Sequence, residues 1–323
     1  MTGLTFSIRT YQPEDLDALV DLINAADAVD QAGFTTTARH LQELLNRPGR
    51  DPTRDVFLAV HRTRRETGGQ LVGYVRLDPR RGGSEDVIRC EGVVLPACRR
   101  RGVGRALLRR AYQRAGELRG EHPAHFDIHA RQSMAGINEL CLSFGMQPVR
   151  YFFWMVHPDL RTIAEPTFPS GFQLVDGTAF HDLAARTAAF NEAFAQHWGF
   201  VPINLEDTEY MVRQPTYQPE NRLIALDEAG QIAGFCTADT TPDMVQSLGG
   251  DKGRVSLLGV RPAYRGRGLG RALLLSAMHR IRAAGLPRAA LGVDGDNVTG
   301  AKRLYESVGF REAGRSIVYR REV

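Results

Sequence analysis

A short segment rich in arginine and glycine occurs twice in this chain. Residues 98–108 read CRRRGVGRALL and residues 264–274 read YRGRGLGRALL, so the two copies lie 166 positions apart. A repeat at this spacing has the size of a domain, and each half of the 323-residue chain is long enough to bury its own core. The segment therefore predicts a tandem duplication of one domain rather than a solenoid of short repeats.

Strand patterns surround both copies at matching places. QLVGY at residues 70–74 resembles QIAGF at residues 231–235, and the repeated segment follows each of them. A helical pattern at 13–26 follows the first strand, and a further strand, a short helix and a last strand are predicted to close each half. The predicted strands before the repeated segment are 6–10, 56–60, 70–75 and 92–95 in the first half, and 172–175, 223–226, 231–235 and 255–260 in the second.

The boundary between the halves is predicted at residues 157–171, HPDLRTIAEPTFPSG, where proline and glycine interrupt the regular patterns. The predicted domains are 1–158 and 170–323. We expect each to be an α+β domain, with a mixed and mostly antiparallel sheet flanked by helices.

Composition narrows the class of protein. The 41 basic residues exceed the 37 acidic ones by four and are spread along the chain, so we expect no nucleic-acid partner. None of the four cysteines forms a C-x-x-C pair, the first residues lack the apolar stretch of a secretion signal, and no run approaches the roughly 20 apolar residues of a membrane span. We expect a cytoplasmic monomer or homodimer with no membrane partner.

Three histidines in HPAHFDIH, His122, His125 and His129, resemble a metal-binding pattern. Residues four apart on a strand, such as His125 and His129, are about 13 Å apart. The three side chains could not share one ion, and no metal site is predicted.

The second arginine–glycine segment has the composition of an anion-binding turn. It lies between a strand ending near Val260 and a helix beginning near Leu269, and a helix start presents free N–H groups and the positive end of the dipole. Its glycines let the backbone approach an anion closely. We predict a pyrophosphate cradle; the alternative is an exposed basic turn whose glycines only cap a helix. The cradle residues are Arg265, Gly266, Arg267, Gly268, Leu269, Gly270 and Arg271, and their counterparts in the first copy are Arg99, Arg101, Gly102 and Gly104, with Val94 on the preceding strand.

Two other phosphate-binding motifs are excluded. The chain has no G-x-x-x-x-G-K-[ST] segment, so it is not a P-loop NTPase. Its R-x-x-G-x-G spacing differs from the dinucleotide G-x-G-x-x-G pattern, and it lies in mid-domain rather than after the first strand.

The run LGVRPAYRGRGLGRALL at 258–274, followed by Asp296-Asn297 and KRLYESVGF at 302–310, resembles the GNAT acetyltransferase superfamily. As a two-domain chain, the protein is similar to tandem GNAT proteins of the mycothiol synthase type. The resemblance implies an N-acetyltransferase that moves an acetyl group from acetyl-CoA, its only cofactor, to a primary amine of a small molecule by direct attack in a ternary complex. The alternative is a non-catalytic scaffold or sensor that binds acyl-CoA.

The resemblance also assigns roles to residues of the second domain. The turn would hold the coenzyme A pyrophosphate, and the strand before it would separate from its neighbour at a bulge to admit the pantetheine arm. Leu258, Gly259 and Val260 match that strand, and a backbone N–H at Leu258 would stabilise the developing oxyanion. Asn297 matches a residue near the pantetheine, although it could be only an N-cap. Tyr305 matches the acid that protonates the departing thiolate, although it could be only a core aromatic.

The residues expected to bind the acceptor amine and to take its proton differ from those of the proteins that the chain resembles. An attacking amine must first lose a proton, and in the mycothiol synthase type a Glu is available for this, where this chain has Arg254. Arg254 could instead face an anionic group of the substrate, and Asp239, Asp294 or His197 could serve as the base. His197 and Trp198 are expected on the acceptor wall, although Trp198 and Phe200 could simply pack a helix pair.

The two copies are not equivalent. Beyond the turn the better offset is 164, which aligns Tyr305 with Cys141, Phe310 with Met146 and Asn297 with Ser133. The first domain keeps a cradle but lacks the acid, although Glu91 could act as a base. We therefore predict a degenerate first domain, which could still bind coenzyme A, and an active second domain.

Overall fold

The computed structural model describes residues 4–30, 35–61, 69–81, 85–296 and 300–323. The chain divides into two compact units, one formed by Met1–Arg150 with Ser316–Val323 and the other by Tyr151–Arg315. The predicted boundary at 158–170 lies inside the second unit. Strands β6 (Gln147–His157) and β12 (Arg311–Glu322) contribute residues to both units.

The sheet of the first unit has the order β1-β2-β3-β4-β5-β12. All neighbours are antiparallel except β4 and β5, which run parallel. Side chains alternate along β2, so that Leu58 packs in one apolar cluster and Phe57 in another. The strands are β1 (Phe6–Thr10), β2 (Val56–His61), β3 (Gln70–Arg80), β4 (Asp86–Val94) and β5 (Ala124–Arg131), with Ser316–Glu322 of β12.

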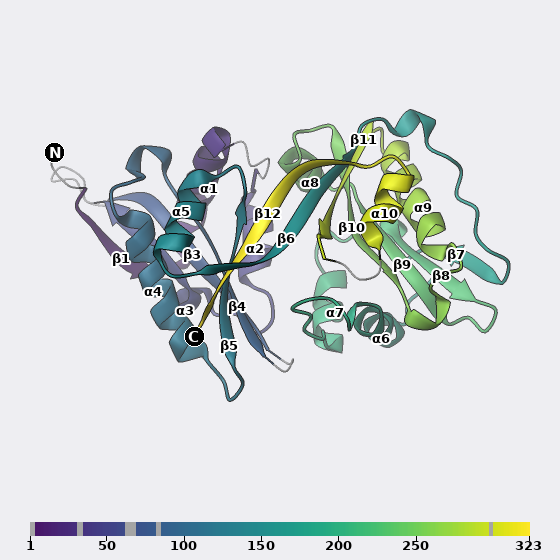
Figure 1. Cartoon of the computed structure of the whole chain (residues 1–323), viewed down its shortest axis with the longest axis horizontal. Helices are drawn as coiled ribbons and strands as arrows, with labels where there is room; N and C mark the ends of the chain where they lie inside the picture. The colour runs from purple at the N-terminus through teal and green to yellow at the C-terminus, as the bar shows by residue number, and fades with distance from the viewer. Residues whose placement is uncertain (1–3, 31–34, 62–68, 82–84, 297–299) are drawn as a thin grey trace. The chain divides into compact units, whose positions relative to one another are not determined.

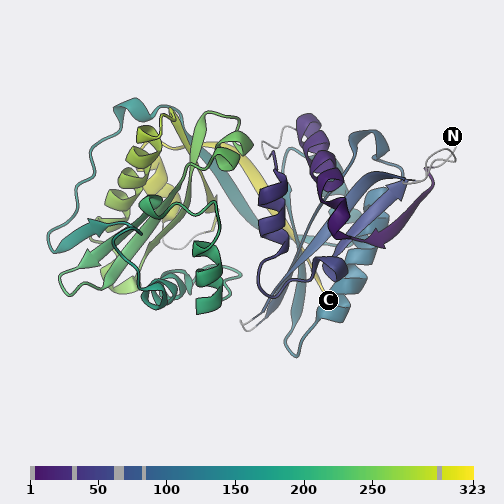
Figure 2. The same ribbon diagram turned by 180° about the vertical axis from the view of Figure 1, so that it is seen from behind.

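Helices cover both faces of this sheet. α1 (Leu16–Asp30) and α2 (Ala38–Leu45) pack on the face of Leu58, and α4 (Val103–Leu118) and α5 (Ala135–Ser143) pack on the face of Phe57. Figure 2 shows α1 and α2 in purple in front of the sheet.

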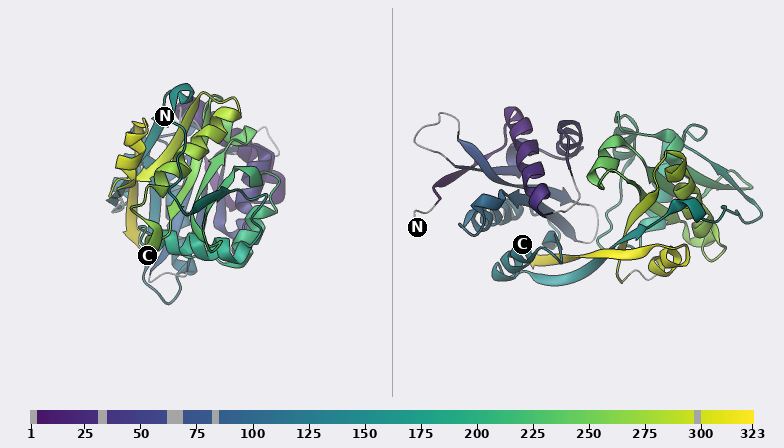
Figure 3. Two further views of the ribbon diagram at one scale, coloured as in Figure 1. Left: turned by 90° about the vertical axis from the view of Figure 1, so that its right-hand side faces the viewer. Right: turned by 90° about the horizontal axis from the view of Figure 1, so that it is seen from above.

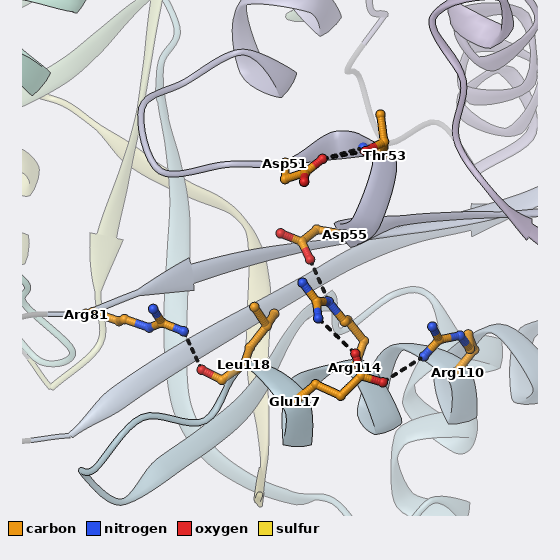
Figure 4. Close-up of polar contacts among 8 residues, drawn as sticks. All are labelled: Asp51, Thr53, Asp55, Arg81, Arg110, Arg114, Glu117 and Leu118. Atoms are coloured by element: carbon orange, nitrogen blue, oxygen red, sulfur yellow. Dashed lines mark hydrogen bonds and ion pairs between the residues drawn. The ribbon is translucent and has the colours of Figure 1, made fainter.

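A buried ion pair attaches α4 to the short helix α3 (Pro52–Asp55), which leads into β2. Nε of Arg114 donates to Asp55 at 2.9 Å, and each side chain is only 7% exposed. The same guanidinium donates to Glu117 one turn further along α4, at 2.8 Å (Figure 4). Removing Asp55 would leave the buried Arg114 paired with the more exposed Glu117, and removing Arg114 would leave the Asp55 carboxylate buried without this cation.

The second unit repeats the arrangement with the strand order β6-β11-β10-β9-β8-β7. Only β10 and β11 run parallel. Asp182 caps α6, and Asn204 forms a capping box with Asp207 at the start of α7. The strands are β7 (Phe172–Val175), β8 (Arg222–Asp227), β9 (Ile232–Asp239), β10 (Lys252–Val260) and β11 (Arg288–Asp294). The helices are α6 (Leu183–Phe194), α7 (Leu205–Val212), α8 (Pro242–Ser247), α9 (Leu269–Ala283) and α10 (Ala301–Ser307).

In this unit α9 and α10 pack on one face of the sheet and α6 packs on the other (Figures 1 and 3). The order of the first five strands, with one parallel pair between the fourth and fifth, is thus the same in both units. The predicted α+β class and the tandem repeat are confirmed. None of the helices that the structure describes is long and apolar enough to cross a membrane.

Several local predictions are refined by the structure. The helix predicted at 13–26 begins as a short 3-10 turn at Pro13–Asp15 and continues to Asp30, and the strand predicted at 92–95 is the end of the longer strand β4. The predicted strands 223–226 and 231–235 are joined by a tight turn at 227–230, where the Asp227 carboxylate accepts from the N–H groups of Ala229 and Gln231 and Gly230 has φ +74°. The segment between the predicted strands 56–60 and 70–75 is rich in charged residues, and its residues 62–68 lie outside the described residues.

The closing strands are exchanged between the halves of the sequence. β6 ends the first half of the sequence, yet its residues 152–157 pair with β11 of the second unit. β12 ends the chain, yet Ser316–Glu322 pair with β5 of the first unit. The expectation that each closing strand completes its own half is therefore wrong. Strand pairing at this sequence distance leaves no local signal, whereas the breakers at 157–171 leave a strong one.

Candidate functional site

The arginine–glycine turn of the second unit is the N-terminus of α9. Gly268 is its N-cap with φ +85°, Gly266 has φ +76°, and no side chain caps the helix. These dihedrals suit only glycine without strain, so the segment folds as a turn because of its glycines. Its first N–H groups have no partner within the helix and are open to an anion. A Cβ built on Gly268 would meet nothing closer than Pro169, at 4.0 Å, so the space beside the turn is open.

The first arginine of each turn stabilises the turn by hydrogen bonds to backbone carbonyls. Nε of Arg265 donates to the Val260 carbonyl at 3.0 Å and its Nη2 donates to Ala193 at the end of α6, at 2.9 Å. Nε of Arg99 donates to Val94 at 2.9 Å in the same way. Arg267 and Arg271 are exposed instead. Of the three predicted cradle arginines, these two have guanidinium groups available to a phosphate.

The two turns differ in charge. Arg99 forms a bidentate ion pair with Asp30, at 2.6 and 2.7 Å, whereas Arg265 meets the neutral amide of Gln196 at 3.3 Å. Asp30 and Gln196 lie at the same 166-residue offset as the two arginines. Arg100, which takes the place of Gly266 with φ +59°, pairs with Glu139 at 2.7 Å. Carboxylates therefore reduce the positive charge at the first turn.

The second turn keeps its charge. Within the described part of the chain, none of Arg265, Arg267 and Arg271 forms an ion pair within 4 Å. Arg303 occupies the place of Glu139 at the 164-residue offset. An anion at this turn would meet guanidinium groups and helix N–H groups without a competing carboxylate.

The strand before the second turn separates from its neighbour. β10 pairs with β11 only at Lys252–Arg254 and carries a bulge between Val255 and Leu257 in its pairing with β9. From Val255 onward β10 has no ladder to β11 among the described residues, which leaves backbone groups facing a gap. This is the bulged, diverging strand that the resemblance implied.

The matching strand of the first unit is more regular. β4 pairs with β3 from Val87 to Val94 without a register shift, and its ladder with β5 continues to Cys90. The separation therefore begins later along β4, and no bulge widens it.

Gly259 brings β10 close to α6. A Cβ at this position would lie 2.5 Å from the Phe235 ring and 3.1 Å from Ala193. Phe235 stacks with Phe190 and contacts Phe194, both on α6. Glycine is required here because the aromatic cluster fills the space of a side chain.

Tyr305 packs on the α9 face of the sheet. It lies on α10 in the core of this unit, 8% exposed, and burial, with a smaller effect from Cys236, raises the pKa of its phenol well above the ordinary value. The phenol is therefore protonated at neutral pH. Leu304 lies beside Gly270 as Leu140 lies beside Gly104, at 3.5 and 3.3 Å from the built Cβ atoms. This supports the alignment that puts the fully buried Cys141 in the place of Tyr305.

Asn297 lies outside the described residues, so its predicted position beside the gap is not described.

The predicted acceptor residues lie on the opposite, α6 face. Asp239 and Arg254 are directly opposed on β9 and β10, and the Arg254 guanidinium lies 5.8 Å from the Trp154 ring. Burial lowers the pKa of Arg254, with Asp239 acting in the opposite direction. Nε of Arg254 is buried without a hydrogen-bond partner.

The loop after α6 contributes aromatic rings to this face. The Trp198 ring lies 6.4 Å from Phe152, whereas His197 packs on Phe194 at 4.8 Å and Phe200 packs on Phe190 at 6.3 Å. The alternative prediction, that Phe200 simply packs against a helix, is therefore confirmed. Sequence reasoning missed Phe152 and Trp154, because β6 was assigned to the first domain. Only the pairing of β6 with β11 reveals them.

A cavity of about 140 Å³ lies between α6, α7 and the sheet. It was not predicted from the sequence, because its lining comes from helices and strands that only the fold brings together. Phe235 and Leu257 place it beside the bulged part of β10. Its lining is mostly apolar, with the polar side chains Arg186, Thr208, Tyr217, Arg222 and Thr237.

Two units with the same order of their first five strands, each with a glycine-rich helix start that no side chain caps, define a tandem two-domain protein. The chain belongs to the acetyltransferase (GNAT) family, whose model matches residues 24–132 and 187–310. This family assignment confirms the predicted enzyme class, an acetyltransferase that uses acetyl-CoA.

Relatives and solved structures agree with this assignment. The chain is 34% identical over 253 residues to a mycothiol acetyltransferase of Thermomonospora curvata, covering 78% of this chain and 79% of the relative. It is 32% identical to a mycothiol acetyltransferase of Thermobispora bispora, covering 96% and 97%. A GCN5-related N-acetyltransferase from Sphaerobacter thermophilus superposes with a TM-score of 0.74 at 25% identity, covering 98% and 95%. A tandem GNAT protein from the clavulanic acid biosynthesis pathway superposes with a TM-score of 0.71 at 18% identity, covering 98% of each chain.

Proposed function

We propose that this protein is an N-acetyltransferase that moves the acetyl group of acetyl-CoA to a primary amine of a small molecule, and that the second domain performs the reaction. The observation that carries the proposal is the bulge in β10, after which β10 and β11 separate; β4 has no such bulge. The charged, uncapped start of α9 lies at the end of the same strand.

The residues at the turn fit the pyrophosphate of acetyl-CoA. N–H groups from Gly266 to Gly270 would hold its oxygens, and Arg267 and Arg271 would add charge-assisted hydrogen bonds. The open space beside Gly268 leaves room for the phosphates. The gap beside Leu258, Gly259 and Val260 would take the pantetheine arm, with Asn297 near it.

Acetyl-CoA, when bound, supplies an activated thioester. The chain would orient that group in the gap, so that the amine attacks directly from the α6 face in a ternary complex. A backbone N–H at Leu258 would donate to the developing oxyanion. Tyr305 would give its proton to the departing thiolate from the α9 face, and its raised pKa means that the phenol still holds that proton at neutral pH.

The base on the acceptor side is one of Asp239, Asp294 or His197. Asp239 accepts from the Thr241 hydroxyl at 2.9 Å and lies opposite Arg254 on the face where the amine would arrive. Asp294 lies at the end of β11 and is 7% exposed. His197 packs against Phe194. Asp239 is our first choice, because it lies on β9 opposite Arg254, on the face where the amine would arrive, and is less buried than Asp294.

The acceptor need not be that of the mycothiol acetyltransferases. In this chain a partly buried arginine, Arg254, stands where the mycothiol synthase type offers a glutamate, and it brings a positive charge to the acceptor wall. We propose that the acceptor differs accordingly.

Calorimetric titration of the full chain with acetyl-CoA is the first experiment, followed by coenzyme A release with a panel of amines. We expect one site per chain and release of free thiol with at least one amine. Absence of binding would overturn the proposal. Tight binding without transfer to any amine would favour the scaffold or sensor alternative.

A further inference from the structure

The cavity on the α6 face has a basic end. Arg186 donates from Nη1 to the Tyr217 hydroxyl at 2.8 Å, and the guanidinium carbons of Arg222 and Arg186 lie 5.1 and 5.8 Å from the Tyr217 ring. Two guanidinium groups therefore flank one tyrosine, and all three side chains line the cavity.

Few negative charges lie close to these two arginines. In the ranges that the structure describes, neither Arg186 nor Arg222 forms an ion pair within 4 Å. Burial lowers the pKa of Arg222, with Asp239 acting in the opposite direction. Asp239 is also opposed to Arg254, so this carboxylate acts on two partly buried guanidinium groups, and Glu220 acts more weakly on Arg222. A desolvated cation with no carboxylate within ion-pair distance is stabilised by an anion that enters its site.

The rest of the cavity is apolar and lies toward the gap. Arg222 is on β8, Phe235 is on β9 and Leu257 is on the bulged part of β10. The cavity thus runs across three strands, from the basic end to the edge where β10 leaves β11. An engineered cavity of about 150 Å³ holds a benzene ring, and the cavity here has about 140 Å³.

We propose that this cavity binds the acceptor, and that the acceptor is an amine with an anionic group at its far end and an apolar body the size of one ring between the two. Arg222 and Arg186 hold the anion, with Tyr217 fixing Arg186, and the amine lies at Leu257 beside the thioester. The inference rests on the proposed function and names its substrate class.

Two probe compounds of equal shape test the proposal. 4-(Aminomethyl)benzoate carries the anion, and 4-methylbenzylamine has a methyl group in its place. Affinity is measured by calorimetry on the full chain saturated with coenzyme A, and transfer is measured with acetyl-CoA. We expect the acid to bind at least about tenfold more tightly and to react with a correspondingly higher kcat/KM, since hydrogen bonds to charged groups have this magnitude.

Variants of cavity residues test whether the preference for the anionic probe arises in the cavity. Arg222→Gln should remove most of the tenfold preference, Arg222→Lys should retain part of it, and Tyr217→Phe should weaken it less. Arg213→Gln is the matched control, because Arg213 lies 72% exposed at the end of α7 and pairs with Glu209. Unchanged thermal unfolding and acetyl-CoA affinity of the variants establish that the fold and the cradle are intact.

Equal affinities of the two probes, or binding of neither at millimolar concentration, would overturn the inference. So would a preference for the acid that survives Arg222→Gln in a folded variant. Failure of acetyl-CoA to bind would be a failure of the proposed function instead, and the two results are therefore distinguishable.

Discussion

The two units of this protein have the same strand order and the same glycine-rich turn, yet they differ in the strand that leads to the turn. In the second unit a bulge at 255–257 and a three-pair ladder leave β10 separated from β11 over its last six residues. In the first unit β4 has no bulge, and its parallel ladder extends over five pairs. A repeated motif therefore does not establish a repeated site, because access to the turn depends on the strand before it.

The charged residues near the two turns also distinguish the two units. Asp30 and Glu139 pair with arginines of the first turn, whereas Gln196 and Arg303 take these places at the second. A helix start attracts phosphate through a partial charge of about half a unit. One nearby carboxylate can cancel that attraction, so the differences at these positions are as informative as the repeated sequence of the turn.

Blocking the two turns in parallel should give the largest difference between the units. Gly268→Val and Gly102→Val both put a β-branched residue at φ near +86°, where the two glycines have +85° and +87°. We expect the first change to abolish acetyl-CoA binding and the second to leave the affinity unchanged. Calorimetric titration of both variants makes the comparison. Loss of binding with Gly102→Val would give the first unit a cofactor role and contradict the assignment.

Removing Asp55 should destabilise the first unit strongly. Asp55→Ala leaves Arg114 charged and buried, which we expect to cost about 3 kcal/mol of unfolding free energy. Asn221 lies at the matching position of the second unit and has the neutral partners Gln218 and Thr240, so Asn221→Ala should cost about 1 kcal/mol. Urea unfolding measures both. Equal losses would show that the Arg114–Asp55 pair contributes no more than neutral hydrogen bonds.

Local patterns predicted the repeat, the strands and the turn, because each depends on residues close together in sequence. The start of α9 at Leu269 and the hairpin at Asp227 follow from their glycines. The exchange of β6 and β12 could not be predicted in this way, since the pairing of distant strands depends on which sheet edges are available in the folded chain. The position of Trp154 depends on that exchange, and the cavity depends on how the helices pack against the sheet. Neither was predicted from the sequence. The role of Asn297 stays a prediction.

Tyr305→Phe should reduce kcat by about 100-fold without changing acetyl-CoA affinity, because a general acid contributes this much or more. Tyr112→Phe is a matched control in the first unit, where the Tyr112 hydroxyl donates to the Glu322 carbonyl. Burial raises the pKa of Tyr305 above its ordinary 10.0, so the phenol keeps its proton to higher pH and the alkaline fall in kcat should begin above pH 10. A wild-type rate in the Phe variant would make Tyr305 a core aromatic and nothing more.

Moving the carboxylate of the first turn into the second should have the smallest effect and tests the charge argument directly. In Gln196→Asp the new side chain would pair with Arg265 as Asp30 pairs with Arg99. We expect acetyl-CoA affinity to fall by about three- to tenfold, since an exposed charge near a helix start is worth about 1 kcal/mol. The loss should shrink at high salt, because exposed charges are screened. Gln196→Glu is the control, since its longer side chain carries the same charge with a different reach. Unchanged affinity in both variants at low salt would mean that strand separation alone distinguishes the two units.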